Sequence, residues 1–187
     1  MHDNGSRCKL TIDGMDVFIK EQRPFSPKWW SHKSNGPGLR YEIGICIQTG
    51  WICWFNGPFP CGSFNDSRIS MEALIYVLRR DEKVQVDSTY GGLYHETPDK
   101  GRRGTPYERM KSKARARHET INGRIKGFGC LSNRWRHPLS KHGIAFGAVA
   151  NIIQVQIEKE GTTFGVEYDD RRIRPTQPRR RRSHHNT

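Results

Sequence analysis

The sequence predicts a single α+β domain, a mixed central sheet with helices packed on it, in the order β-β-β-α-β-α-α. Two observations lead to this order. Apolar and polar residues alternate in segments between residues 9 and 55, which is typical of strands. Apolar residues recur at helical spacing in three later segments, and a short apolar run separates the first of these helices from the second. A chain of 187 residues is long enough to bury a core without disulfides or a structural metal. The five cysteines show no zinc-finger spacing and indicate a reducing compartment.

Three strands are expected before residue 56. Residues 9–19 alternate around Leu10 and Ile12, and we expect Asp13 near the end of this strand, followed by a turn at Asp13-Gly14. Residues 40–49 and 51–55 predict two further strands, and the Gly-containing turn between them indicates an antiparallel hairpin.

The next elements are a helix over residues 70–80 and a fourth strand. Asn65 or Asp66 is a good N-cap for the helix, whose expected core residues are Met71, Leu74, Ile75 and Leu78. The strand covers residues 82–87 and ends on Asp87, and the segment 93–106 reads as an irregular basic loop.

Two helices follow, one from about Pro106 to Lys126 and one over residues 141–158. On the first, a core-facing stripe is expected at Met110, Ala114, His118, Ile121, Ile125 and Phe128, and a polar face at Arg115, Glu119, Asn122 and Lys126. The core side of the second is expected at Ile144, Phe146, Val149, Ile152, Ile153 and Ile157. An edge strand over residues 162–170 would complete the domain, which spans residues 9–168 between a loose N-terminus (1–8) and a disordered basic tail (169–187).

The charge balance predicts a phosphate-rich partner. Lys and Arg number 32 against 19 Asp and Glu, a formal net charge of +13, which favours nucleic acid. No apolar run is long enough to span a bilayer, and no secretory leader is visible. The basic helix would hold the DNA backbone through Arg109, Lys111, Lys113, Arg115, Arg117, Arg124 and Lys126.

Three carboxylates predict a metal site. If the first and fourth strands are neighbours, Asp13 and Asp87 meet at one place on the sheet, and a helix packed on that sheet can bring Glu119 to it. Such a trio repels itself unless a cation joins it, and Mg²⁺ or Mn²⁺ accepts oxygen ligands of this kind. The alternatives are ordinary: a strand-end Asp as a turn or cap residue, and a helical Glu paired with arginines at i±4.

The order of elements, with a returning fourth strand beside the first, is that of the ribonuclease-H-like fold, although other α+β layouts share it. The chain also resembles the DDE superfamily endonuclease domain of Harbinger-type transposases. The motifs that support the resemblance are TIDGMDVFI, WWSHKSNGPGLRYEIGICIQTGWICWFNGPFPCG, NDSRIS, VDSTYGG, ARARHETINGRIKGFGCLSNRWRH and FGAVANIIQVQIE.

The resemblance implies metal-dependent cleavage and transfer of DNA strands at transposon ends, in the nucleus. Asp13 would be the first acid and Glu119 the last. Asp87 is preferred as the middle acid, and Asp66 is an alternative or accessory metal ligand, or a helix cap. His118 would orient a substrate phosphate or pack in the core.

Two functions stay open at this stage: an active DDE-type nuclease or transposase domain, and a catalytically dead, domesticated or decayed DNA-binding relative. No helix-turn-helix module precedes Asp13, so the chain is truncated, a relic, or assisted by a separate DNA-binding protein or a second copy of itself.

Overall fold

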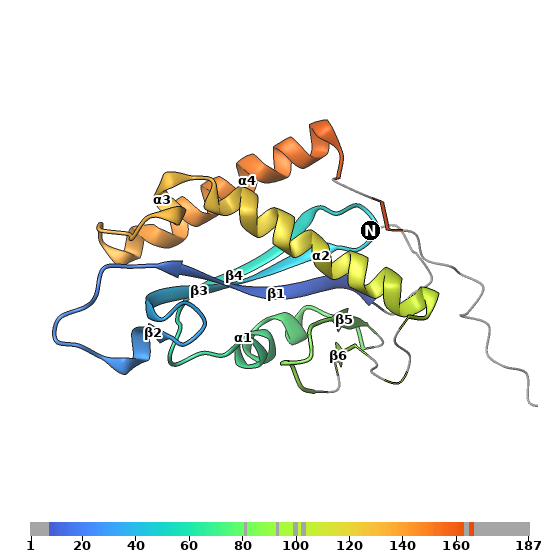
Figure 1. The fold of residues 1–187 in the computed structure, drawn as a ribbon, viewed down its shortest axis with the longest axis horizontal. Helices are drawn as coiled ribbons and strands as arrows, with labels where there is room; N and C mark the ends of the chain where they lie inside the picture. Colours follow the sequence, from blue (N-terminus) through green and yellow to red (C-terminus); the bar gives the residue numbers. More distant parts are fainter. Residues whose placement is uncertain are drawn as a thin grey trace, which may run out of the picture.

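The fold is a six-stranded mixed sheet between two layers of helices, and the expected α+β class is confirmed. The computed structural model describes residues 8–80, 82–92, 94–98, 101, 104–162 and 165–166. Helices α2 (Pro106–Lys126), α3 (Gly129–Ser132) and α4 (His142–Glu160) lie on one side of the sheet, and α1 (Asp66–Glu72) lies on the other (Figure 1).

Strand β1 (Cys8–Phe18) lies at the centre of the sheet. It pairs antiparallel with β3 (Gly36–Cys46) and parallel with β5 (Lys83–Gln85). Beyond β3 lie β4 (Ile52–Pro60) and the short β2 (Trp30–Ser31), and beyond β5 lies β6 (His95–Glu96), parallel to it. The first and fourth expected strands are therefore neighbours, and β6 was missed because it has only two residues.

The expected turn at Asp13-Gly14 is wrong, because β1 runs through both residues without a break. Asp13 lies opposite Ile43 of β3, and Gly14 lies opposite Glu42. A glycine inside a strand weakens it but lets another group approach the backbone closely, and here it marks such an approach rather than a turn.

The helix predicted over residues 70–80 is shorter and begins earlier. It is capped by Asn65, whose Oδ1 accepts a hydrogen bond from the backbone N–H of Arg68 at 2.8 Å, and it gives way to a 3₁₀ turn at Leu74–Tyr76. Leu74 is buried as expected, but Met71 is 40% exposed, and Ile69 takes the core position instead. Asp66 is thus the first helical residue and not the cap.

The basic helix matches its prediction closely. Thr105 Oγ1 accepts a hydrogen bond from Glu108 N–H at 3.3 Å, and Pro106 opens α2 at a position where its missing N–H costs nothing. The expected stripe is buried except for Phe128, which is half-buried. Ile121 and Ile125 pack with Met15, Val17 and Tyr41, whereas the preceding turns of α2 pack near Cys8 and Ile47.

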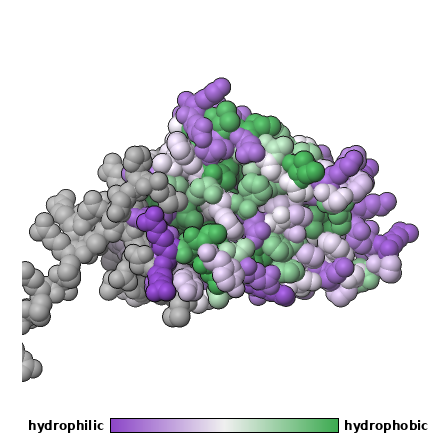
Figure 2. All heavy atoms as spheres, turned by 180° about the vertical axis from the view of Figure 1, so that it is seen from behind, coloured by the Kyte–Doolittle hydropathy of each residue, from purple (hydrophilic) through white to green (hydrophobic). Residues whose placement is uncertain are grey.

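For α4, two of the expected core residues are wrong: Ile144 is 75% exposed and Ile152 is 47% exposed. Phe146, Val149 and Ile153 do face the sheet. The helix is apolar almost all round, so periodicity alone could not select its buried face. From behind, green apolar patches lie among hydrophilic side chains (Figure 2).

Within the described residues, no helix is long and apolar enough to cross a membrane. The expected strand over residues 162–170 lies largely outside the described residues, as does the expected basic tail.

Candidate active site

Three aspartates from different elements lie near the middle of β1, with Asp13 on the strand positions that face α2 and Asp66 on the α1 face. Asp13 lies within β1, Asp87 follows β5, and Asp66 begins α1. Burial, chiefly, and then the neighbouring carboxylates of Asp66 and Asp87 raise the pKa of Asp13 to about 6 from its ordinary 3.8, although Lys33 and the Gly14 N–H act in the opposite direction. The parallel pairing of β1 with β5 places Asp87 just beyond the strand next to β1, where it is exposed and its Oδ1 accepts a hydrogen bond from Thr89 N–H at 2.7 Å.

Gly14 makes room for Asp66. A Cβ atom at residue 14 would lie 1.9 Å from Asp66 Oδ1, far inside any real contact. The carboxylate of α1 therefore packs directly on the backbone of β1, next to Asp13. This close approach explains why a glycine follows Asp13 in the strand.

We expect Gly14→Ala to displace Asp66 and to lower the free energy of unfolding by about 1–3 kcal/mol, as overpacking commonly does. Urea denaturation measures the change. Gly123 of α2 provides the control, because no atom within 4 Å would meet its Cβ, and Gly123→Ala should be neutral or stabilising by up to about 1 kcal/mol. Equal effects of the two substitutions would contradict the close approach.

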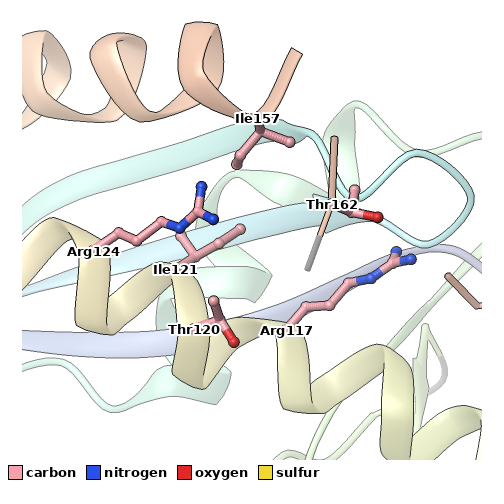
Figure 3. A pocket seen from close by; sticks show the side chains of 7 residues that line it. Arg117, Thr120, Ile121, Arg124, Ile157 and Thr162 are labelled. Carbon is pink, nitrogen blue, oxygen red and sulfur yellow. The ribbon is translucent and has the colours of Figure 1, made fainter. Parts of the chain in front are cut away.

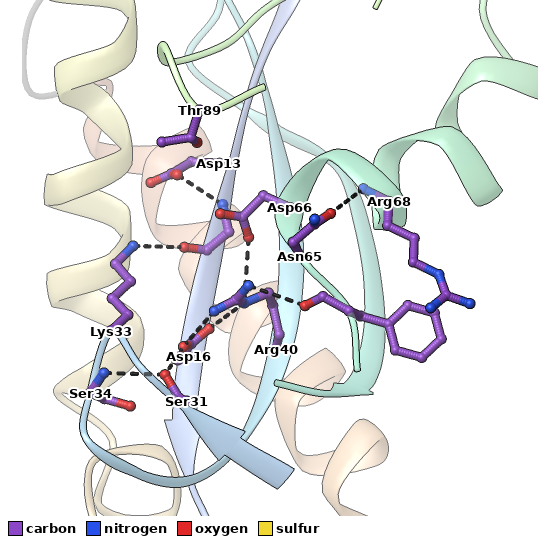
Figure 4. A network of polar contacts seen from close by, with 12 residues as sticks. Asp13, Asp16, Ser31, Lys33, Ser34, Arg40, Asn65, Asp66, Arg68 and Thr89 are labelled. Atoms are coloured by element: carbon purple, nitrogen blue, oxygen red, sulfur yellow. Dashed lines mark hydrogen bonds and ion pairs between the residues drawn. The ribbon is translucent and has the colours of Figure 1, made fainter. Parts of the chain in front are cut away.

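A buried ion pair between Arg40 and Asp16 lies next to Asp66. Arg40 of β3 lies opposite Asp16 of β1 and binds its carboxylate with both Nε, at 2.6 Å from Oδ1, and Nη2, at 2.8 Å from Oδ2. Ser31 Oγ donates a further hydrogen bond to Asp16 Oδ2. Arg40 Nε also lies 3.4 Å from Asp66 Oδ1, so the pair anchors the third aspartate (Figure 4).

Lys33 provides a second cation. Its Nζ donates to the backbone oxygen of Gly14 at 3.3 Å, and its charge lowers the pKa of both Asp13 and Asp66, which burial raises. Figure 4 shows the lysine reaching toward β1 beside Asp13. The site is thus an acidic group partly balanced by Arg40 and Lys33.

Two further buried groups adjoin the aspartates. Glu42, 1% exposed, accepts a hydrogen bond at Oε1 from Trp54 Nε1 at 2.9 Å, whereas its Oε2 has no hydrogen-bond partner among the described residues. Burial and then the Asp66 carboxylate raise the pKa of Glu42 to about 7. The Tyr90 hydroxyl also makes no hydrogen bond to a described residue, and burial together with the surrounding carboxylates raises its pKa.

For five residues of this region no sequence motif predicts a site role: Asp16, Lys33, Arg40, Glu42 and Tyr90. For three of them a signal lies in the strand register, which places Asp16 opposite Arg40 and Gly14 opposite Glu42. A turn predicted at Asp13-Gly14 hides that register, because it ends the strand before Asp16.

Glu119, the acid predicted on α2, takes no part in the contacts described above. It is exposed on α2 and makes no hydrogen bond or ion pair with another described residue. Its neighbour His118 points inward, where its Nε2 lies 2.8 Å from Thr11 Oγ1, and burial lowers its pKa to about 3. The packing alternative for His118 is therefore confirmed.

Two of the seven cations expected to hold DNA are buried. Lys111 Nζ donates to Thr97 O at 3.0 Å and pairs with Glu96 and Glu108, and Arg117 Nη1 donates to Ile47 O at 2.6 Å. Lys111 and Arg117 are therefore not available to bind DNA, contrary to the prediction. Arg109, Lys113 and Lys126 are exposed, and Arg115 and Arg124 are half-buried.

Figure 3 shows Arg117 and Arg124 on one side of α2. Arg117 extends toward the turn between β3 and β4, and Arg124 lines a small hollow with Thr120, Ile157 and Thr162. Arg117 thereby links the basic helix to the sheet, a structural role that its sequence context did not reveal.

The donor set suits a hard divalent cation chemically, because all of its acids offer oxygen ligands. Asp66 Oδ1 is buried without a hydrogen bond, although Arg40 Nε lies 3.4 Å away as an ion-pair partner. Yet no three His, Cys, Asp or Glu side chains of the described segments stand close enough together to hold a metal as they are. Binding would require side-chain rearrangement.

Comparisons with protein-family models, with curated proteins and with solved structures find no match to this chain.

Proposed function

We propose that this chain is a metal-dependent nuclease with a ribonuclease-H-like sheet. The strand order supports the class: β1, β3 and β4 form an antiparallel trio, and β5 returns after α1 to lie parallel beside β1. The proposal depends on the placement of Asp66 against Gly14, whose N–H donates a hydrogen bond to Asp13 Oδ1, and of Asp87 just after the strand that pairs with β1.

Within this class we propose the DDE-type endonuclease domain of a Harbinger-like transposase. The support is the set of motifs that surrounds Asp13, Asp87 and Glu119, together with the +13 charge that suits double-stranded DNA. Nuclear localisation and action at transposon ends follow from the same resemblance.

Asp13 and Asp87 would hold Mg²⁺ or Mn²⁺, with Asp66 as an accessory ligand and Glu119 as the acid of α2. When bound, such ions activate water and stabilise the leaving oxygen of a phosphodiester. Asp13 must be ionised to serve, and its pKa of about 6 means that it is largely ionised at neutral pH. Lys33 favours that ionised state and would neutralise a phosphate at the same place.

Nicking of supercoiled plasmid DNA with Mg²⁺ or Mn²⁺ tests the proposal. We expect the wild type to nick and Asp13→Asn to be slower by at least about 100-fold, because loss of a ligand should cost no less than loss of its supporting groups. Glu119→Gln should also abolish nicking, since α2 would have to bring this acid to the site.

The exposed Glu72 provides the control, and Glu72→Gln should nick as the wild type does. A wild-type protein that does not nick with either ion, or an Asp13→Asn protein that nicks equally well, would refute the catalytic proposal. Nicking that survives Glu119→Gln alone would remove Glu119 and leave the three aspartates.

The second candidate is a non-catalytic DNA-binding protein derived from such an enzyme. The exposed position of Glu119 favours it, as does the lack of a preformed three-ligand group in the described residues. This protein would retain DNA without divalent-dependent cleavage, and substitution of the aspartates would leave binding unchanged.

A further inference from the structure

A second basic surface lies where β1 ends, away from the exposed cations of α2. It consists of two adjoining hollows, one of about 720 Å³ lined by Arg134, Arg136 and His137, and one of about 410 Å³ lined by Lys20, Arg23 and the same two arginines. We call these five residues the basic groove. In Figure 2 the end of the molecule at which β1 terminates, on the right, is rimmed by hydrophilic side chains.

The backbone of the groove is fixed by the sheet. Trp135 N–H donates to Phe18 O at 3.0 Å, and Lys20 N–H donates to Trp135 O at 2.9 Å, which adds a short parallel bridge at Ile19 to the end of β1. Successive side chains of an extended segment point to opposite sides. Trp135 is accordingly buried, and Arg134 and Arg136 both face solvent.

The two arginines are spaced for a phosphate chain. Positions two apart on an extended backbone are about 6.6 Å apart, which is close to the separation of successive phosphates along one nucleic-acid strand. The guanidinium fork also binds phosphate oxygens in pairs, which makes arginine well suited to this ligand.

The positive charge of the groove is not balanced within the described chain. Glu21 is the one acid that lines either hollow, and no Asp or Glu occurs between Glu119 and Glu158. None of the basic-groove side chains forms an ion pair with a described acid. Clustered cations of this kind lower the free energy of a bound polyanion and release its counterions.

We propose that the basic groove binds the phosphate backbone of duplex DNA at a distance from the carboxylates. Lys20 lies seven residues beyond Asp13, which corresponds to about 23 Å along the strand direction and to about seven base pairs. DNA cleaved at the aspartates would thus be held on its flank by residues that follow the end of β1 and are bridged to Trp135. The choice of DNA as the ligand rests on the proposed function.

The test is binding of a fluorescent 30-base-pair duplex to the full chain, by anisotropy in a chelating buffer over a range of salt concentrations. We expect Arg134→Gln/Arg136→Gln to weaken binding by about tenfold at 0.1 M salt and to reduce the slope of log K against log salt by about 2. The matched control is Arg79→Gln/Arg80→Gln, which removes two exposed arginines far from the groove in sequence.

Equal weakening by the two double variants, or none by the groove variant, would overturn the inference. We expect both variants to unfold at the wild-type temperature, because the replaced side chains are exposed, and a thermal melt checks that they fold. The plasmid assay keeps the proposals distinct: groove-dependent binding without nicking refutes the nuclease alone, and nicking with groove-independent binding refutes the groove alone.

Discussion

Replacing Asp16 by alanine is expected to lower the free energy of unfolding by about 3–5 kcal/mol, the cost of leaving one partner of a buried ion pair alone. Asp16 is 6% exposed and Arg40 is 9% exposed, and two hydrogen bonds join them. Without Asp16, Arg40 keeps Phe64 O at 3.1 Å and is drawn toward Asp66, at 3.4 Å. The loss should therefore lie near the lower end of that range.

The exposed pair of Arg68 and Glu72 is the control for Asp16→Ala. Its Nε–Oε1 distance of 2.8 Å is close to the 2.6 and 2.8 Å of the buried pair, but its side chains are 55% and 44% exposed. We expect Glu72→Ala to cost no more than about 0.5 kcal/mol. Urea denaturation at pH 7 measures both, and a loss below about 1 kcal/mol for Asp16→Ala would show that the buried pair contributes no more than a surface pair.

The sign of the pH dependence is a further check on the same pair. Arg40 and Ser31 hold the pKa of Asp16 below its ordinary 3.8 against the opposing effect of burial. A lowered folded-state pKa stabilises the fold above the unfolded-state value, and the stabilisation is lost as the pH falls through the folded-state pKa. The difference between wild type and Asp16→Asn should therefore shrink below pH 4.

The sequence predicted the parts of the fold that local periodicity determines. The stripe on α2 and the hairpin of β3 and β4 follow from residue spacing, and the pairing of β1 with β5 follows from the order of elements. Asp13 and Asp87 could be chosen because Asp13 lies in β1 and Asp87 follows β5 by two residues. Asp66 was found only as an alternative, because its approach depends on a missing Cβ at Gly14.

The remainder depends on contacts that sequence spacing does not encode. The face of α4 is decided by packing against Phe55 and Tyr41, and nothing in its apolar sequence distinguishes Ile144 from Phe146. Lys111 and Arg117 read as surface charges, yet each finds carbonyl oxygens in the interior. Burial of a charged side chain is uncommon, so composition could not single them out.

Glu42→Gln is expected to stabilise the fold at high pH and to leave it nearly unchanged at low pH. Burial and then the Asp66 carboxylate raise the pKa of Glu42 from 4.5 to about 7, against the hydrogen bond from Trp54. The folded chain therefore binds more protons than the unfolded chain between these values, so the free energy of unfolding falls as the pH rises through that window. The total is on the order of 3 kcal/mol, at about 1.4 kcal/mol per pH unit.

Glutamine removes this penalty because its amide keeps an oxygen for Trp54 Nε1 and cannot ionise. Urea denaturation in chelating buffer should find wild type and Glu42→Gln within about 0.5 kcal/mol of each other at pH 4.5, and the variant more stable by about 2–3 kcal/mol at pH 8. Asp13 and Asp66 are present in both proteins, so the difference between the two reports the Glu42 charge together with its repulsion of Asp66. A difference in stability that does not change with pH would contradict the prediction. It would mean that the Glu42 carboxylate is solvated and that its pKa is not raised by burial or by Asp66.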